Sequence, residues 1–274
     1  MSIVPDFYGR FACRAGACRH SCCRGWEIDV DEASAAFYGE IPGALGEKLR
    51  RSLHRDENGA HFVLTDTDRC PFLCEDGLCE LIRTLGEDSL CDICALHPRF
   101  YEDVCDVELC GLGLSCEAAC DLLLEGDGPL QLIDEESGEG MDMAGLLARL
   151  GFPFEPALLH FDGRPPSARF LTLLGETEAI DERWPEELAA VRAGLSGARL
   201  PVGERRDRML QYLLFRQLER AEQNRLDALL DYARESTAFI AAQDALFGAD
   251  PEHLRRFSEQ IEYSTENVGI LLGR

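Results

Sequence analysis

The chain has 274 residues, with 51 acidic and 27 basic side chains and a formal charge of −24. This length predicts one or two domains, and an apolar fraction of 46% excludes a disordered chain. The acidic balance argues against nucleic acid or anionic lipid as a partner, because both are polyanions. No apolar run reaches the ~18–20 residues that span a bilayer. The first residues lack the pattern of an export signal, so we expect a cytoplasmic protein with no membrane partner.

Helical patterns dominate the first hundred residues. Asp29 or Asp31 is placed to cap a helix over residues 33–37. Leucines four residues apart predict an amphipathic helix over Ala44–His54. A further helix is expected over Leu78–Leu85, because a glycine follows its last residue.

Strand signal is sparse. His61–Leu64 facing Pro71–Leu73 predicts one small β-hairpin. Behind a Ser115 cap, Cys116–Glu125 is expected to form the next helix.

The second half of the chain begins with an acidic, glycine-rich segment, Glu125–Gly140, which is typical of a linker or exposed loop. Pro185 and Pro251 mark the starts of two later helices. Between them, a broad apolar face predicts a long helical pattern over Glu204–Ile240. The predicted fold is mainly α, with a metal-organised N-terminal module packed with a C-terminal helical module. The predicted bounds are 1–124 for the cysteine-rich module, 125–142 for the linker and 143–274 for the helical module.

Cysteine is the unusual residue. All 13 cysteines lie between Cys13 and Cys120. An odd number excludes complete internal pairing, and disulfides are not expected in a reducing compartment. Metal ligation, redox chemistry and ordinary buried thiols remain, and the clustering favours metal.

The thiols fall into three groups, and one group is followed by a histidine, His97. Four thiolates serve zinc as well as a [4Fe–4S] cluster, so spacing does not choose between the two metals. Single members such as Cys74, Cys105, Cys110 and Cys120 are equally well explained as small core residues. The groups are Cys13, Cys18, Cys22 and Cys23; Cys70, Cys74, Cys79, Cys91 and Cys94; and Cys105, Cys110, Cys116 and Cys120.

The order of these cysteines resembles the flagellin lysine N-methylase (FliB-like) family, which is related to small proteins with a YkgJ-type CxxxCxxCC cluster. Near the C-terminus, Glu262, Ser264 and Asn267 are similar to the closing E-x-S-x-x-N segment of that family. The matching N-terminal segments are Cys13-x4-Cys18-x3-Cys22-Cys23-x-Gly25-Trp26-x-Ile28-Asp29, Cys70-Pro71-Phe72-Leu73, Leu78-Cys79, Leu85-Gly86-Glu87, Cys94-x-x-His97-Pro98-Arg99 and Leu114-Ser115-Cys116-x-x-Ala119.

The resemblance implies methyl transfer from S-adenosylmethionine to lysine side chains of flagellin, with a cysteine-bound iron–sulfur cluster as the metal centre. An ordinary polar methyl transfer needs no electrons, so we expect that centre to organise the fold. Catalytic residues and the cofactor pocket are not assigned. The thiols that match the family, and are therefore the candidate metal ligands, are Cys13, Cys18, Cys22, Cys23, Cys70, Cys79, Cys94 and Cys116. Five others fall outside its pattern: Cys74, Cys91, Cys105, Cys110 and Cys120.

Several other residues have a plain structural interpretation beside a functional one. Gly111-Leu112-Gly113 is the only candidate for a nucleotide-binding turn, and a flexible turn before Ser115 is favoured. His97 stands where the family has an aromatic residue, which favours packing over ligation. Trp26 is interpreted as a buried anchor on the metal site, with a wall of a cofactor pocket as the alternative.

Three further positions leave alternatives open. Arg99 either binds a carboxylate or fixes a loop. Tyr101 is a candidate for orienting a lysine amine. Glu262, Ser264 and Asn267 either line a site or form a polar helix face.

Two other functions remain open beside methylation. One is a non-enzymatic iron- or zinc-binding protein, and the other is a redox protein whose cluster transfers electrons. Both share only the cysteine module with the family.

Overall fold

The computed structural model describes residues 1–57, 59–194, 197 and 199–273, with only the backbone of 222–225. The chain forms two compact units. The main unit contains Met1–Phe11 and Pro98–Arg274, and the inserted unit contains Ala12–His97. The second unit is therefore an insertion in the chain of the first. These bounds differ from the predicted division into 1–124, 125–142 and 143–274.

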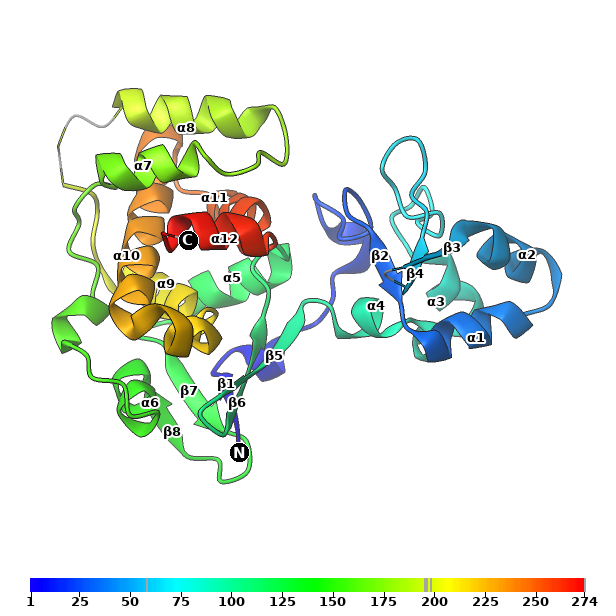
Figure 1. The fold of residues 1–274 in the computed structure, drawn as a ribbon, viewed down its shortest axis with the longest axis horizontal. Coiled ribbons are helices and arrows are strands. Elements are labelled where there is room, and N and C mark those ends of the chain that lie inside the picture. The colour runs from blue at the N-terminus through cyan, green and yellow to red at the C-terminus, as the bar shows by residue number, and fades with distance from the viewer. Residues whose placement is uncertain (58, 195–196, 198, 274) are drawn as a thin grey trace. The chain divides into compact units, whose positions relative to one another are not determined.

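The inserted unit contains a three-stranded antiparallel sheet in the order β2-β4-β3, with four short helices (Figure 1). Asp31 caps the first helix, as predicted, by accepting a hydrogen bond from the Ser34 amide. Gly86 ends the third helix with a φ of 92°, also as predicted. The elements are β2 (Ile28–Val30), α1 (Glu32–Glu40), α2 (Gly43–Ser52), β3 (Leu53–Asp56), β4 (Gly59–Phe62), α3 (Glu80–Leu85) and α4 (Asp92–Leu96).

The predicted hairpin pairs its first strand, near His61, with the wrong segment. The strand near His61 exists as β4, but it pairs with β3 and β2 and not with Pro71–Leu73. The helix predicted to reach His54 ends at Ser52, and the chain continues directly into β3. Leu53 pairs with Phe62, so the last apolar position of the predicted helical stripe belongs to a strand.

The main unit contains a five-stranded sheet that the sequence did not predict, in the order β5-β6-β1-β7-β8. Its central strand, β1, pairs in parallel with β6 and antiparallel with β7. The strands β7 and β8 lie within the segment predicted as a linker, which is therefore part of the sheet. The strands are β1 (Ser2–Pro5), β5 (Arg99–Val104), β6 (Val107–Leu112), β7 (Gln131–Asp134) and β8 (Gly140–Asp142).

Helices supply the rest of the main unit and carry most of its core. About half of the described chain is helical, so the predicted mainly α class describes only part of the structure. The helices are α5 (Glu117–Glu125), α6 (Met143–Arg149), α7 (Ala168–Leu174), α8 (Arg183–Gly194), α9 (Glu204–Phe215), α10 (Ala221–Phe247), α11 (Pro251–Phe257) and α12 (Thr265–Leu271). Short 3₁₀ turns and a π-helical turn, η6 (Ser258–Glu262), connect these helices. The 3₁₀ turns of the described chain, in both units, are Tyr8–Arg10, Ala15–Ala17, Glu87–Ser89, Pro156–Leu159 and Leu218–Arg220.

Two helix predictions need correction. The pattern over Glu204–Ile240 is two helices, α9 and α10, because the chain breaks at Arg216 and Gln217. At this break, the Arg216 and Gln217 side chains both donate hydrogen bonds to the buried carboxylate of Glu262. A continuous helix does not require these two hydrogen bonds. The cap of α5 is Cys116 and not Ser115, and its side chain makes no capping hydrogen bond.

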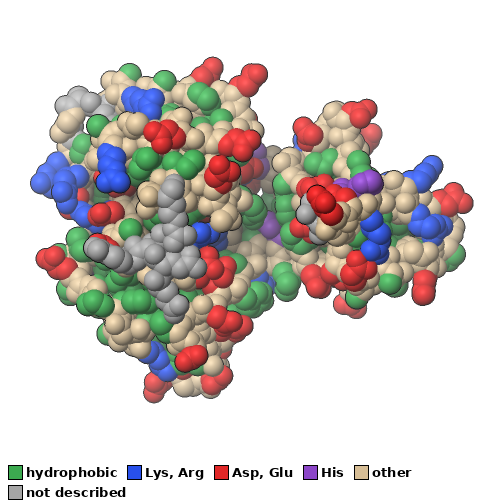
Figure 2. All heavy atoms as spheres, in the orientation of Figure 1, with side chains coloured by type: hydrophobic (Ala, Val, Ile, Leu, Met, Phe, Trp, Pro, Cys, Tyr) green, Lys and Arg blue, Asp and Glu red, His purple; other side chains and the backbone are tan. Residues whose placement is uncertain are grey.

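Each unit has its own apolar core. The main core joins the sheet to α5 through α12, whereas the inserted core contains far fewer buried residues. Acidic side chains are spread over the visible face of both units (Figure 2). Within the described ranges, no helix is both long enough and apolar enough to cross a membrane.

Candidate functional site

Seven of the eight candidate ligand thiols lie in the inserted unit. Cys116, the eighth, lies in the main unit as the residue before α5. Each of the others belongs either to the core of the inserted unit or to its N-terminal loop. The core group is Cys23, Cys70, Cys79 and Cys94, and the loop group is Cys13, Cys18 and Cys22.

The core group is held together by the backbone. The Cys70 amide donates to the Cys23 carbonyl at 2.8 Å, which brings two segments 47 positions apart side by side. Cys79 lies in a short bridge with Leu73 and directly precedes α3. Cys94 follows one turn after Cys91, whose carbonyl accepts the Cys94 amide at 3.0 Å.

Cys91 joins this group although it falls outside the family pattern. Its side chain is 1% exposed, and it packs in the same core as Cys70. A hydrogen bond from the Cys94 thiol lowers the Cys91 pKa, and the same interaction raises the pKa of Cys94. The CxxC spacing of Cys91 and Cys94 was a signal for this pairing in the sequence.

The thiols of this core group affect one another's ionisation. A hydrogen bond from Cys22 lowers the pKa of Cys23 to about 7, and Ser21 contributes in the same direction. Burial raises the pKa of Cys70 to about 12, with further contributions from Cys23, Cys79 and Cys91. The fold holds these thiols close together, although they would repel one another as thiolate anions. A metal cation bound among them therefore lowers the electrostatic free energy most.

The N-terminal loop lies against a turn in the same unit. A side chain on Gly16 would meet the Asp76 carbonyl at 2.6 Å, so this close approach requires glycine. Gly77 faces it, with a φ of 79°. The loop that carries Cys13 and Cys18 is thereby fixed beside the turn that links Cys74 to Cys79.

These contacts do not amount to a completed metal site. Among the described residues, no group of three or more cysteine, histidine, aspartate or glutamate side chains has the arrangement of a metal site. The eight candidate ligands therefore stay a prediction. What the fold brings together is a core group of five thiols, namely Cys23, Cys70, Cys79, Cys91 and Cys94.

The remaining cysteines are in the main unit, apart from Cys74. Cys120 is fully buried, and its thiol donates to the Leu114 carbonyl at 2.8 Å. Cys110 is buried in β6, 3.1 Å from the Ser2 hydroxyl. Both agree with the interpretation as core residues. Cys105 does not, because it is exposed in the β5–β6 turn with a φ of 47°.

Trp26 and His97 lie beside each other, with ring centroids 6.1 Å apart. Burial lowers the pKa of His97 to about 4, so the ring is neutral at physiological pH. This agrees with packing as its role. The Trp26 indole donates to the Cys22 carbonyl, and the side chain is only half-buried, so it is not the buried anchor that we expected.

Glu262 is the centre of a second polar site, in the main unit. Its side chain is 0% exposed, and its Oε1 accepts from Arg216 Nε at 2.9 Å and from Gln217 Nε2 at 3.4 Å. The Arg216 guanidinium also lies over the Phe100 ring, 4.8 Å from its centroid. Burial lowers the Arg216 pKa, but the Glu262 carboxylate and nearby hydroxyls outweigh this, and the net pKa is raised.

The rest of the closing segment turns inward as well. Ser264 caps α12 by accepting from the Asn267 amide at 3.1 Å. The Asn267 side chain is 2% exposed and donates to the Glu178 and Gln260 carbonyls. Because Glu262 and Asn267 are buried on either side of a helix start, the polar helix face, one of the two alternatives for this segment, is wrong.

Gly111 is not part of a turn. It lies in β6, and a side chain there would overlap the Phe100 ring and approach the Tyr212 hydroxyl at 2.8 Å. Arg99 stacks over the Phe11 ring at 5.1 Å, which favours a role in fixing its surroundings. Tyr101 is 45% exposed and accepts from the Tyr8 hydroxyl at 3.3 Å.

Known proteins resemble this chain over about half of its length. The lysine-N-methylase of Salmonella typhimurium is 28% identical over 141 residues, covering 48% of this chain and 34% of that protein. The lysine-N-methylase of Salmonella choleraesuis is 27% identical over the same span. The resemblance to the lysine N-methylase family is confirmed. The alignment spans about a third of the length of these lysine-N-methylases.

A shorter relative is covered more fully. The flagellar biosynthetic protein FliU of Salmonella muenchen is 27% identical over 139 residues, which cover 82% of that protein. No protein-family model and no solved structure matches this chain. The lysine N-methylase relationship therefore rests on these sequence comparisons.

Proposed function

We propose that this protein methylates lysine side chains of a protein substrate, with S-adenosylmethionine as the methyl donor and flagellin as the candidate substrate. The observation that carries this proposal is the similarity to two lysine-N-methylases. The similarity to a flagellar biosynthetic protein supports the choice of flagellin. A cytoplasmic location follows, because both the donor and newly made flagellin are found there.

The reaction needs a neutral amine and a correctly aligned sulfonium. The lysine ammonium first loses a proton to solvent water, and its nitrogen then attacks the methyl carbon of the sulfonium. A nitrogen–carbon bond forms as the carbon–sulfur bond breaks, leaving a neutral thioether and a methylated ammonium. No electron is gained or lost. The acidic surface of this chain favours the approach of a lysine-bearing protein.

The thiols of the inserted unit support a metal centre as the second part of the proposal. Five buried or half-buried thiols in one small core have the donor chemistry of an iron–sulfur or zinc site. We place a [4Fe–4S] cluster first and zinc as the alternative. Its ligands are drawn from the core group, Cys23, Cys70, Cys79, Cys91 and Cys94. The bound metal holds segments of the inserted unit together and takes no part in methyl transfer.

The direct test is incubation of the purified protein with S-adenosylmethionine and flagellin, followed by mass measurement of the flagellin. We expect mass increments of whole methyl groups on lysine-containing peptides. Flagellin whose lysines have been acetylated is the matched control, and it should gain no mass. An unchanged mass of unmodified flagellin, with no donor binding in calorimetry, contradicts the proposal and favours a metal-binding or redox protein.

The metal is tested separately by the visible absorption of anaerobically purified protein. A brown chromophore with iron and sulfide in cluster proportions is the expected result. Colourless protein that contains zinc would replace the cluster by the alternative metal and leave the methylation proposal intact.

A further inference from the structure

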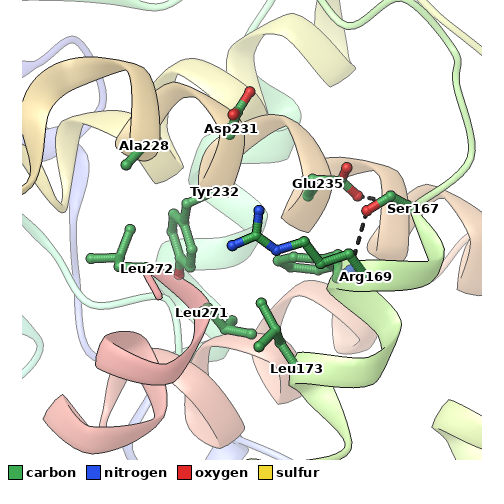
Figure 3. A pocket seen from close by; sticks show the side chains of 10 residues that line it. Ser167, Arg169, Leu173, Ala228, Asp231, Tyr232, Glu235, Leu271 and Leu272 are labelled. Atoms are coloured by element: carbon green, nitrogen blue, oxygen red, sulfur yellow. Dashed lines mark hydrogen bonds between the residues drawn. The ribbon is translucent and has the colours of Figure 1, made fainter. Parts of the chain in front are cut away.

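A cavity of about 280 Å³ opens in the main unit between α7, α10 and α12 (Figure 3). A second hollow of about 220 Å³ shares Ser167, Asp231 and Glu235 with it. Small-molecule pockets usually measure ~300–1,000 Å³, and the two adjoining hollows together reach this range. Every residue that lines them belongs to the main unit and is described.

Within the described part of the chain, the cavity contains one cation, Arg169, and two anions, Asp231 and Glu235, that no ion pair neutralises. The exposed Arg169 side chain extends across the cavity toward Tyr232 (Figure 3), and no salt bridge joins it to another described residue. Asp231 lies on α10 at the rim of the cavity, likewise without an ion pair within the described part of the chain. Glu235, beside it, accepts the Ser167 amide at 2.8 Å. An occupant that matches this site carries both a carboxylate and a positive or hydroxyl group.

The rest of the lining is apolar. Phe170 and the Tyr232 ring are buried, and Leu271 and Leu272 complete the floor from the end of α12. Flat or aliphatic parts of a ligand gain free energy by covering such surface. A purely anionic or purely hydrocarbon occupant would leave part of this lining unmatched.

The cavity is connected to the closing Glu-x-Ser-x-x-Asn segment. Burial raises the pKa of Tyr232, and the charge of the Glu262 carboxylate raises it further, so the buried Arg216–Glu262 pair acts electrostatically on a residue of the cavity wall. Ser264 caps the start of α12, whose other end supplies Leu271 to the cavity. The segment that resembles the family therefore fixes the floor of this cavity.

We propose that this cavity binds S-adenosylmethionine, an inference that rests on the proposed function. Arg169 pairs with the carboxylate of the amino-acid part. Asp231 accepts hydrogen bonds from the ammonium or the ribose hydroxyls. Tyr232, Leu271 and Leu272 cover the apolar surface of the ligand.

The test is calorimetric titration of the intact protein and of Arg169→Met with two ligands. One is S-adenosylmethionine, and the other is 5′-methylthioadenosine, which lacks the amino-acid part. We expect the substitution to weaken S-adenosylmethionine binding about tenfold or more, because a hydrogen-bonded ion pair is lost. Binding of 5′-methylthioadenosine should change less than twofold.

Arg205→Met is the matched control. Arg205 is exposed and is the second residue of α9, just as Arg169 is the second residue of α7. The Arg205→Met variant should bind both ligands as tightly as the unaltered protein does. A second variant, Ala228→Trp, fills the cavity and should weaken both ligands, while thermal unfolding checks that it folds.

The outcomes separate this inference from the proposed function. If Arg169→Met and Ala228→Trp bind the donor normally while the unaltered protein methylates lysine, the cavity assignment is wrong and the function stands. Equal weakening of both ligands by Arg169→Met also contradicts the assigned carboxylate contact. Failure of the unaltered protein to bind the donor, with no methyl transfer, contradicts the inference and the function together.

Discussion

The two units of this protein are stabilised in different ways. The main unit buries a large apolar core and adds the buried ion pair Arg216–Glu262 and a pair between the buried Arg208 and the half-buried Asp6. The inserted unit has a small core in which Cys70 and Cys91 are themselves buried members. Units of this size gain little free energy from apolar burial alone, and many contain a disulfide or a metal. The difference teaches that the buried thiols Cys110 and Cys120 are packing residues of the main unit, whereas seven of the eight candidate ligands lie in the inserted unit.

The largest expected effect separates two buried thiols. Cys70→Ala should remove most of the bound metal and unfold the inserted unit, because structural metal binding contributes folding free energy directly. Metal analysis and hydrogen exchange over residues 12–97 measure both effects. Cys120→Ala is the control, since Cys120 is also buried but lies in the main unit. The Cys120→Ala variant should keep its metal, and its unfolding free energy should fall by about 1–2 kcal/mol. Full metal content in Cys70→Ala would remove the contrast between the units.

The buried ion pair gives the next largest effect. Glu262→Gln should destabilise the main unit by about 3 kcal/mol, because the buried Arg216 charge loses its carboxylate. Urea unfolding followed by hydrogen exchange over residues 98–273 measures the change. Arg183→Met removes an exposed pair with Glu187 and should cost less than about 1 kcal/mol. Equal costs for the two variants would show that burial does not distinguish these pairs.

The close packing of side chains against Gly111 in the main sheet gives a smaller effect. Gly111→Ala should cost about 1–3 kcal/mol, because its side chain would press on Phe100 and Tyr212. At Gly9, no atom lies within 4 Å of an added side chain, so Gly9→Ala should change stability by about 0.5 kcal/mol or less. Thermal unfolding of both variants makes the comparison. A stable Gly111→Ala protein would mean that Phe100 moves aside at little cost.

The smallest effect concerns the acid stability of the inserted unit. The pKa of His97 is lowered by burial from 6.5 to about 4, so the unfolded chain binds a proton more readily than the folded one. The contribution of the neutral His97 ring to the unfolding free energy is complete above pH 6.5, and it is lost as the pH falls towards 4. His97→Phe should therefore flatten the pH dependence of unfolding across that window. An unchanged slope would contradict a buried neutral imidazole.

The sequence predicts the features that depend on neighbouring residues. The Asp31 cap and the Gly86 stop of the inserted unit, and the Pro251 helix start of the main unit, follow from local backbone chemistry. The five-stranded sheet does not, because Ile3 pairs with Leu109 and Asp134, more than a hundred positions away. Short strands with few alternating positions give no local signal of such pairing.

The candidate sites follow the same rule. Clustering identifies the thiols, but the sequence does not show that the Cys70 amide reaches Cys23, or that Cys116 belongs to the other unit. Glu262 and Asn267 are polar, and the sequence leaves a polar helix face and the lining of a site as alternatives. Their burial depends on Arg216 and on the Glu178 carbonyl, which are distant in the chain.

The central claim is that this chain transfers methyl groups from S-adenosylmethionine to protein lysines. Its most direct test uses a donor whose methyl group carries deuterium, with flagellin and the anaerobically purified protein, followed by peptide mass spectrometry. The account predicts labelled methyl groups on lysine nitrogens and on no other residue type. Flagellin that stays unlabelled, although the protein retains its metal and binds the donor, would contradict it.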